Sequence, residues 1–297
     1  MNRMLSLYLM SEKGLRVLEA VFSQYPELIN RVIVGRDSGV ENDFSDEIQS
    51  YCANHSIPCF DRTNISSNET EYSLAISWRW LIRDSDTQLI VIHDSLLPKY
   101  RGFNPLVTAL INGDDEIGAT ALWANENYDC GDIIYQSSFD VDYPLRIADA
   151  ICEMAKHYQV LSLRIAEALF NAQALPRIIQ NEANASYSLW RDEGDYYLDW
   201  TLDCEILKRQ IDAQGYPYQC SATGLKGKKI LIASAAVVDD VDIVNRSPGK
   251  VIFVEDGCPI VVCGVGLLKV TEAVWDSDRK SLLPFNKIRT NFSHDPI

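Results

Sequence analysis

The sequence predicts an α/β protein: a Rossmann-like domain built on a mostly parallel sheet, followed by a smaller β-barrel-like domain. Short apolar runs alternate with helical patterns in the first third of the chain, as in a parallel sheet with helices on its faces. Beyond about residue 200, short strand-like runs separated by glycine turns are typical of a small barrel or sandwich. A length of 297 residues fits two domains, for which we predict bounds of 1–200, including a linker from about 174, and 201–297.

The predicted elements of the first domain follow from the spacing of its apolar residues. Strands are expected at 5–10, 31–35, 57–60, 72–78, 89–92, 118–123 and 132–136. A turn at 11–14 leads into a helix over 14–25, and a second helix carries Ile48 and Cys52. Apolar residues recur at helical spacing over 147–170, so we expect a long helix there with a stripe that faces the core.

The second domain is expected to be mostly strand. Residues 174–198 hold Pro176 and Gly194 and have the composition of a linker. A short helix is expected over 204–211. Strands are expected at 229–233, 249–255, 259–262 and 267–273.

The charge balance argues against nucleic acid as the main partner. The chain carries 27 Lys and Arg against 42 Asp and Glu, a net charge of -15. Residues 1–185 hold 14 of these basic and 26 of these acidic side chains, so the negative charge is concentrated in the first domain. Binding to phosphate backbones needs clustered Lys and Arg, which this balance does not favour.

Neither a membrane segment nor a metal site is expected. No uncharged apolar run reaches the roughly 18 residues of a membrane helix. The apolar N-terminus runs into Ser11, Glu12 and Lys13 without a signal-peptide cleavage pattern, so we expect a cytoplasmic protein. The eight cysteines show no Cys-x-x-Cys pair and the four histidines no metal-ligand spacing.

The segment over residues 92–105 carries most of the candidate chemistry. Its histidine, His93, follows directly on an expected buried strand, and ligands of open parallel sheets bind at the carboxyl ends of strands. The loop after His93 carries Lys99, Tyr100 and Arg101, whose side chains can bind an anion. A hydrogen-bonded core histidine is the alternative interpretation of His93.

A second candidate, Asp129, lies in the turn before the expected strand at 132–136. A carboxylate near an imidazole holds its tautomer and favours its protonated form. The alternative is that Asp129 only shapes a turn beside Gly131, which Asp often does. Spacing along the sequence does not decide whether Asp129 meets His93.

The run from His93 to Pro105, with its Ser-Leu-Leu-Pro-Lys-Tyr-Arg-Gly core, resembles the signature of formyltransferases that use N10-formyltetrahydrofolate. Residues 118–120 and 129–133 are similar to a second block of that family. Three later segments, 216–218, 227–230 and 248–251, resemble the small β domain of several members. The overall layout is similar to methionyl-tRNA formyltransferase.

The resemblance implies a catalytic pair and a reaction. His93 matches the catalytic histidine and Asp129 the aspartate, and the implied reaction is direct transfer of a formyl group to a primary amine without a metal. The family's asparagine, two residues before the histidine, is Val91 in this chain. Valine donates no hydrogen bond, and loss of one oxyanion donor costs roughly 10²–10³ in rate.

Three explanations for Val91 stay open. In the first, Asn104 or Asn125 replaces the family asparagine as the hydrogen-bond donor. In the second, the enzyme lacks this donor and is slower but still fast enough. In the third, the protein binds folate without transferring its formyl group. By the same resemblance, the expected folate-binding residues are Leu89, Val91, Leu97, Ala124, Asn125, Asn127 and Tyr128. The expected substrate-binding residues are Trp78, Arg79, Lys99, Tyr100, Arg101 and Asn104.

The amine is expected to belong to a nucleotide-linked amino sugar, for surface glycan synthesis. The acidic balance disfavours methionyl-tRNA, the substrate of the nearest alternative branch. Trp78 or Trp80 can stack on a sugar or base, and Arg79 can meet a phosphate or carboxylate. The alternative is that the tryptophans are core residues and that Arg79 forms a structural pair. A homodimer stays open.

Overall fold

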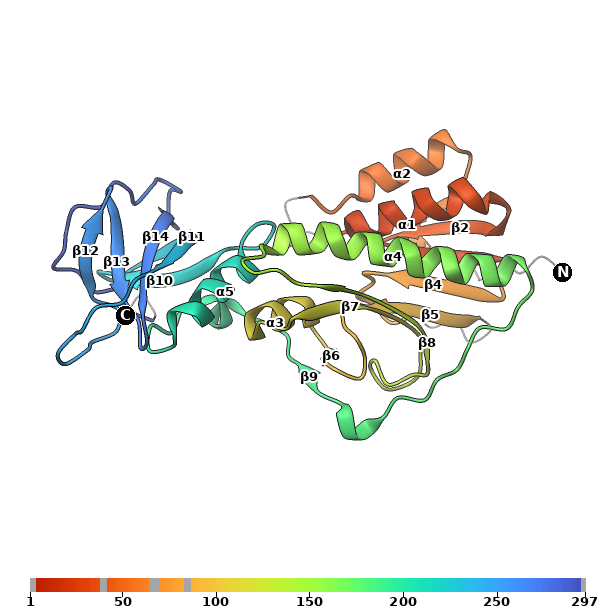
Figure 1. The fold of residues 1–297 in the computed structure, drawn as a ribbon. Coiled ribbons are helices and arrows are strands. Elements are labelled where there is room, and N and C mark those ends of the chain that lie inside the picture. The colour runs from red at the N-terminus through yellow and green to blue at the C-terminus, as the bar shows by residue number, and fades with distance from the viewer. Residues whose placement is uncertain (1–3, 38–41, 65–69, 83–86, 295–297) are drawn as a thin grey trace. The chain divides into compact units, whose positions relative to one another are not determined.

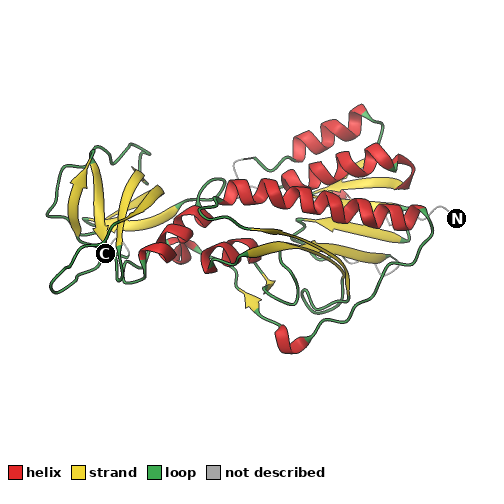
Figure 2. Cartoon of the chain, in the orientation of Figure 1, coloured by secondary structure: helices red, strands yellow, loops and turns green. Residues whose placement is uncertain are grey.

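The computed structural model describes residues 4–37, 42–64, 70–82 and 87–294. These form two compact units. The first comprises Met1–Leu106, Glu116–Asp140 and Ile151–Leu189, and the second comprises Val107–Asp115, Val141–Ala150 and Trp190–Ile297. The domain bounds of 1–200 and 201–297 stay a prediction. Figure 2 shows that helices and strands mix in the first unit, whereas strands predominate in the second.

A seven-stranded sheet organises the first unit, in the order β3-β2-β1-β4-β5-β7-β8 (Figure 1). Its strands are β1 (Leu5–Leu9), β2 (Ile29–Val34), β3 (Cys59–Asp61), β4 (Tyr72–Ile76), β5 (Gln88–His93), β7 (Glu116–Trp123) and β8 (Ile133–Asp140). The five strands from β3 to β5 run parallel, while β7 is antiparallel to both of its neighbours. The predicted α/β class with a mostly parallel sheet is therefore confirmed.

The α-helices that precede residue 171 are α1 (Ser11–Gln24), α2 (Ser45–Asn54), α3 (Pro105–Asn112), which lies mostly in the second unit, and α4 (Ile147–Phe170). Helix α4 has the predicted bounds, and its buried residues Met154, Tyr158 and Ile165 form the expected stripe. The predicted turn at 11–14 is wrong, because α1 already begins at Ser11.

Two further differences have local causes. Strand β4 ends at Ile76 and not at Trp78, because Ser77 adopts a left-handed φ of 54° that ends the extended backbone. Helix α3 was not predicted, although Pro105 at its start has the fixed φ that suits the first helical position.

An antiparallel five-stranded sheet organises the second unit, in the order β10-β11-β14-β13-β12. Its strands are β10 (Ser221–Leu225), β11 (Lys228–Val238), β12 (Val251–Glu255), β13 (Cys258–Val262) and β14 (Leu267–Trp275), and α5 (Cys204–Gln214) packs against it. Strand β10 was not predicted.

The C-terminal segment joins the two edges of this sheet. Gly224 in β10 and Ser293 exchange both backbone hydrogen bonds at 2.9 Å. At the other edge, Val251 of β12 donates to the carbonyl of Thr290 at 2.9 Å, and Phe292 donates to Gly249 at 2.8 Å. Bridging both edges satisfies backbone groups that an open sheet exposes, and it gives the unit its barrel-like character.

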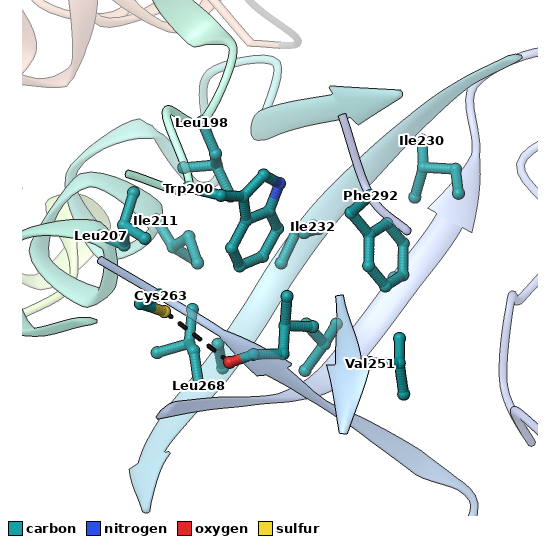
Figure 3. Packing of buried hydrophobic residues seen from close by; sticks show 14 of the residues in the cluster. Leu198, Trp200, Leu207, Ile211, Ile230, Ile232, Val251, Cys263, Leu268 and Phe292 are labelled. Carbon is teal, nitrogen blue, oxygen red and sulfur yellow. Dashed lines mark hydrogen bonds between the residues drawn. The ribbon is translucent and has the colours of Figure 1, made fainter. Parts of the chain in front are cut away.

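The core of the second unit gathers around Trp200 (Figure 3). The Trp200 ring lies 5.8 Å from the ring of Phe292, and its indole nitrogen donates to the hydroxyl of Thr223 at 2.9 Å. Leu207 and Ile211 of α5 are fully buried in the same cluster. Each such side chain contributes about 1.5–3 kcal/mol on burial, so this unit has a hydrophobic core of its own.

Among the described residues, no helix combines the length and apolar character needed to cross a membrane. The same part of the chain holds no group of three His, Cys, Asp or Glu side chains arranged to hold a metal ion.

Candidate active site

His93 is the last residue of β5, at the carboxyl end of the parallel part of the sheet. Its Nε2 lies 2.8 Å from the carbonyl oxygen of Tyr100, and its Nδ1 lies 3.5 Å from Oδ1 of Asp129. Because a carbonyl oxygen can only accept, Nε2 carries a proton and Nδ1 is the nitrogen that faces the carboxylate. The two side chains are only 10% and 17% exposed, so their interaction is weakly screened by water.

Asp129 joins His93 to the loop that follows β5. Its second oxygen, Oδ2, accepts the backbone N–H of Gly102 at 2.8 Å. Its own backbone has a left-handed φ of 56°, which is uncommon for a residue with a side chain. The structure thus brings together the two residues that the sequence singled out, and one carboxylate contacts both the imidazole and the loop.

A glycine is required beside Asp129. A Cβ on Gly131 would lie 1.7 Å from the carbonyl oxygen of Trp123, which no real contact allows. We expect Gly131→Ala to lower the thermal unfolding midpoint clearly, since overpacking of this kind costs about 1–3 kcal/mol or more. Gly215→Ala is the matched control, because a Cβ there makes only ordinary contact, 3.6 Å from the carbonyl of Ile211. Equal midpoints for the two variants would contradict the prediction.

The wall beside His93 is apolar. Leu89, Val91 and His93 lie on one face of β5, because side chains alternate along a strand. Val91 packs against Leu97 and Leu122, and the backbone N–H of Ala124 donates to the carbonyl of Leu89 at 2.9 Å.

The remaining residues predicted to bind folate lie on an exposed loop. Ala124, Asn125, Asn127 and Tyr128 follow β7 and are all exposed. The side-chain oxygen of Asn125 accepts the N–H of Asn127 at 2.9 Å, which shapes this loop. Asn104, the other candidate to replace the family asparagine, is exposed and has a left-handed φ of 48°.

Two residues predicted to bind the substrate have partners within the chain. Trp78 is half-buried, and its ring lies 5.2 Å from that of Tyr8, in an apolar cluster on the sheet. Its indole nitrogen is buried without a partner among the described side chains and backbone groups. Arg79 is exposed and pairs with Asp37 at 2.6 Å. These contacts match the alternative of a packing tryptophan and a structural arginine pair.

Arg101 requires a correction, because the anion contact predicted for it does not fit its surroundings. Its side chain is 1% exposed and makes two hydrogen bonds to Glu182, at 2.7 and 2.8 Å, and two to the side-chain oxygen of Gln180, at 2.8 and 3.1 Å. The hydrogen bonds to Glu182 raise the pKa of Arg101 above its usual value. The charge of Arg101 is therefore paired within the chain, with Glu182. Lys99, in the same loop, is exposed, and Tyr100 is half-buried.

A buried cluster behind His93 was missed by the sequence analysis. The ammonium group of Lys13 lies 2.7 and 2.5 Å from the two oxygens of Asp94, and 4.9 Å from the centre of the Tyr158 ring. The hydroxyl of Tyr158 donates to the carbonyl of Ile92 at 3.0 Å. Burial alone would raise the pKa of Asp94, but the charge and hydrogen bonds of Lys13 outweigh it and lower the pKa. In the sequence, the only sign of a role for Asp94 is its position beside His93 in the run over 92–105.

Two family models match this chain. The formyl transferase model matches residues 70–156, and the model of the formyl transferase C-terminal domain matches residues 192–282. Together they cover more than half of the chain, and the first includes both His93 and Asp129. The chain belongs to the formyl transferase family.

Several methionyl-tRNA formyltransferases are similar to this chain in sequence. The methionyl-tRNA formyltransferase of Syntrophomonas wolfei is 28% identical over 207 residues, which is 70% of this chain and 64% of that protein. The chain thus spans less than two thirds of that relative. Among solved structures, the sugar 3N-formyl transferase WlaRD, determined with dTDP and 5-N-formyl-THF, matches 91% of this chain and 98% of its own, with a TM-score of 0.68.

A second solved structure gives a similar match. The N-formyltransferase of Helicobacter canadensis, in complex with folinic acid and dTDP-3-aminofucose, covers 91% of this chain and 99% of its own, with a TM-score of 0.69. Both structures are 16% identical to this formyl transferase. At that identity the likeness shows a shared fold, and the choice of substrate does not follow from it.

Proposed function

We propose that this formyl transferase moves the formyl group of N10-formyltetrahydrofolate to the primary amine of a nucleotide-linked amino sugar, for surface glycan synthesis. The single observation that carries the proposal is the half-buried pair of His93 and Asp129 at the carboxyl end of β5. The net charge of -15 supports a small substrate over a tRNA. Two sugar formyl transferases share the fold over nearly their whole length, so the fold is compatible with the sugar branch.

The surroundings of His93 fit a folate. The wall formed by Leu89, Val91 and Leu97 is apolar, as a flat heterocycle requires. The exposed loop over 124–128 adds backbone groups and two asparagines that can orient the polar edge of such a ring. N10-formyltetrahydrofolate would supply the activated formyl carbon at this wall.

The pair of side chains accounts for the proton movements of such a transfer. The attacking amine loses a proton and N10 of the departing tetrahydrofolate gains one, so no net proton is consumed. The Asp129 carboxylate, 3.5 Å from Nδ1 of His93, orients the imidazole and takes part in the proton transfer. The imidazole stabilises the negative charge that develops on the oxygen of the formyl group.

Val91→Asn tests which group stabilises this oxyanion. The amide would stand on the same face of β5 as His93, and we expect it to raise kcat by about tenfold, as part of the 10²–10³ that one donor contributes. Leu89→Asn places the same amide on the same face but further from His93, and is the matched control. Steady-state kinetics of formyl transfer give the measurement. If Val91→Asn gains no more than the control, the oxyanion donor lies elsewhere, and Asn104 and Asn125 become the residues to replace.

The direct test is a substrate panel. Purified protein is mixed with N10-formyltetrahydrofolate and UDP- or dTDP-linked amino sugars, and release of tetrahydrofolate is followed by absorbance. We expect turnover with at least one sugar. Salt-sensitive formylation of methionyl-tRNA without sugar turnover would favour the tRNA branch, which the names of the curated relatives suggest. Tight folate binding without transfer to any amine would overturn the enzymatic proposal.

A further inference from the structure

The segment predicted as a linker runs along the active site of the first unit. The backbone N–H of Ser186 donates to the carbonyl of Pro98 at 3.1 Å, and Arg101 donates to Ser186 at 2.8 Å. Short strands β6 (Arg101–Gly102) and β9 (Tyr187–Ser188) pair in parallel. This part of the chain therefore belongs to the wall of the site and is not a free connection.

Gln180, in the same segment, uses both ends of its amide. Its nitrogen Nε2 donates to the backbone carbonyls of Asp129 and Gly131, at 2.7 and 2.8 Å. Its oxygen Oε1 accepts from Nε and from one terminal nitrogen of Arg101, at 3.1 and 2.8 Å. The side chain is 6% exposed. One buried amide thus connects the loop of Asp129 with the loop that follows β5.

These contacts bear on the conformation of Asp129. A non-glycine residue with a left-handed φ, such as Asp129 at 56°, persists only where its surroundings hold it. Gln180 holds the main chain of Asp129 on one side, and Gly102 holds its carboxylate on the other. Arg101, which Gln180 also binds, directly precedes Gly102, so both anchors of Asp129 depend on the same side chain.

We propose that Gln180 is a positioning residue of this formyl transferase, which sets the Asp129 carboxylate relative to His93 by tying the main chain at Asp129 to Arg101. The inference rests on the proposed function of the His93 and Asp129 pair. Gln180 acts through Asp129 and Arg101, and no contact between Gln180 and substrate is required.

Two variants separate the contacts of Gln180. Gln180→Met removes both its donors and its acceptor without adding charge. Gln180→Glu keeps an acceptor for Arg101 but loses the donation to Asp129 and Gly131. We expect each to lower kcat by about 10- to 100-fold, with KM for both substrates within about twofold, since a misplacement of about 1 Å costs up to 10² in rate.

The matched control is Glu182→Gln. Glu182 also binds Arg101, at 2.7 and 2.8 Å, but within the described part of the chain the hydrogen bonds of its side chain go to Arg101 and not to the Asp129 loop. If Gln180 only stabilised Arg101, Glu182→Gln and Gln180→Met would have the same effect on kcat. A kcat that falls in the control as far as in Gln180→Met, or that stays at wild-type level in both Gln180 variants, would overturn the proposal.

A readout without turnover keeps this inference separate from the proposed reaction. The ring nitrogens of His93 are observed by ¹⁵N NMR at one pH in wild type, Gln180→Met and Glu182→Gln, with His93→Gln to assign the signal among the four histidines. We expect the Nδ1 signal to shift in Gln180→Met, because the displaced carboxylate no longer lies 3.5 Å from that nitrogen, and to stay in place in the control. An unchanged signal would refute the role of Gln180, whereas absence of formyl transfer in wild type would refute only the proposed function.

Discussion

Asp129→Asn is expected to lower kcat for formyl transfer by about 10²–10⁴-fold, the range that a positioned acid–base group contributes. The amide oxygen of Asn can still accept the N–H of Gly102, which Asp129 accepts at 2.8 Å, so the loop keeps its shape. The negative charge 3.5 Å from Nδ1 of His93 is lost. Without it the imidazole loses the carboxylate that orients it, and the proton of the attacking amine loses its acceptor.

Asp132→Asn is the matched control, because Asp132 lies in the same turn and its side chain forms a long ion pair with Arg177, at 4.0 Å. Exposed pairs of this kind contribute about 0–1 kcal/mol, so its kcat should stay within about threefold of wild type. Rates of tetrahydrofolate release are measured together with thermal unfolding midpoints for both variants. The prediction fails if Asp129→Asn retains more than a tenth of the wild-type kcat with a sugar that wild type formylates.

A double variant tests whether the two residues act as one unit. Catalytic groups that depend on each other show strongly non-additive effects. His93→Gln combined with Asp129→Asn should therefore be about as slow as the slower single variant. If the rate losses of the two single variants multiply in the double variant, the 3.5 Å contact between the two side chains has no part in the reaction.

His93 and Asp129 could be found from the sequence because each lies next to a short run of residues that predicts a strand or a turn. The strand over 89–92 and the signature run placed His93 at a strand end, and the turn before 132–136 drew attention to Asp129. The large sheet followed from short apolar runs that alternate with helical patterns, and the helix over 147–170 from a period of about 3.6 residues, all of which are local quantities.

The residues that were missed depend on contacts that span much of the chain. Lys13 meets Asp94 across 81 positions of sequence, and Arg101 meets Gln180 across 79. Spacing gives no information on such pairs. The segment around Gln180 has the composition of a linker, yet it contains strand β9, which pairs with β6, and a buried glutamine. Arg101 in an exposed-looking loop was misjudged for the same reason, since its partners lie far along the chain.

Lys13→Met is expected to destabilise the first unit by about 3–5 kcal/mol, the cost of leaving one member of a buried ion pair without its partner. The side chains of Lys13 and Asp94 are 8% and 24% exposed, so water replaces the lost partner poorly. Urea unfolding at pH 7 gives the measurement. The double variant Lys13→Met/Asp94→Leu is the control: with both charges gone, most of the lost stability should return. A double variant as unstable as the single one would show that packing, and not charge, decides the effect.

The same pair predicts a pH dependence with a definite sign. Because Lys13 outweighs burial and lowers the pKa of Asp94 in the folded state, the ionised carboxylate is favoured by folding. Its contribution is fully present above the pKa of the unfolded chain, near 3.9, and is lost as the pH falls through the lower folded value. The stability difference between wild type and Asp94→Asn should therefore be constant from about pH 7 to pH 5 and shrink below about pH 4. A difference that grows on acidification would require a raised pKa for Asp94, which is incompatible with an ammonium group 2.5 Å from its carboxylate.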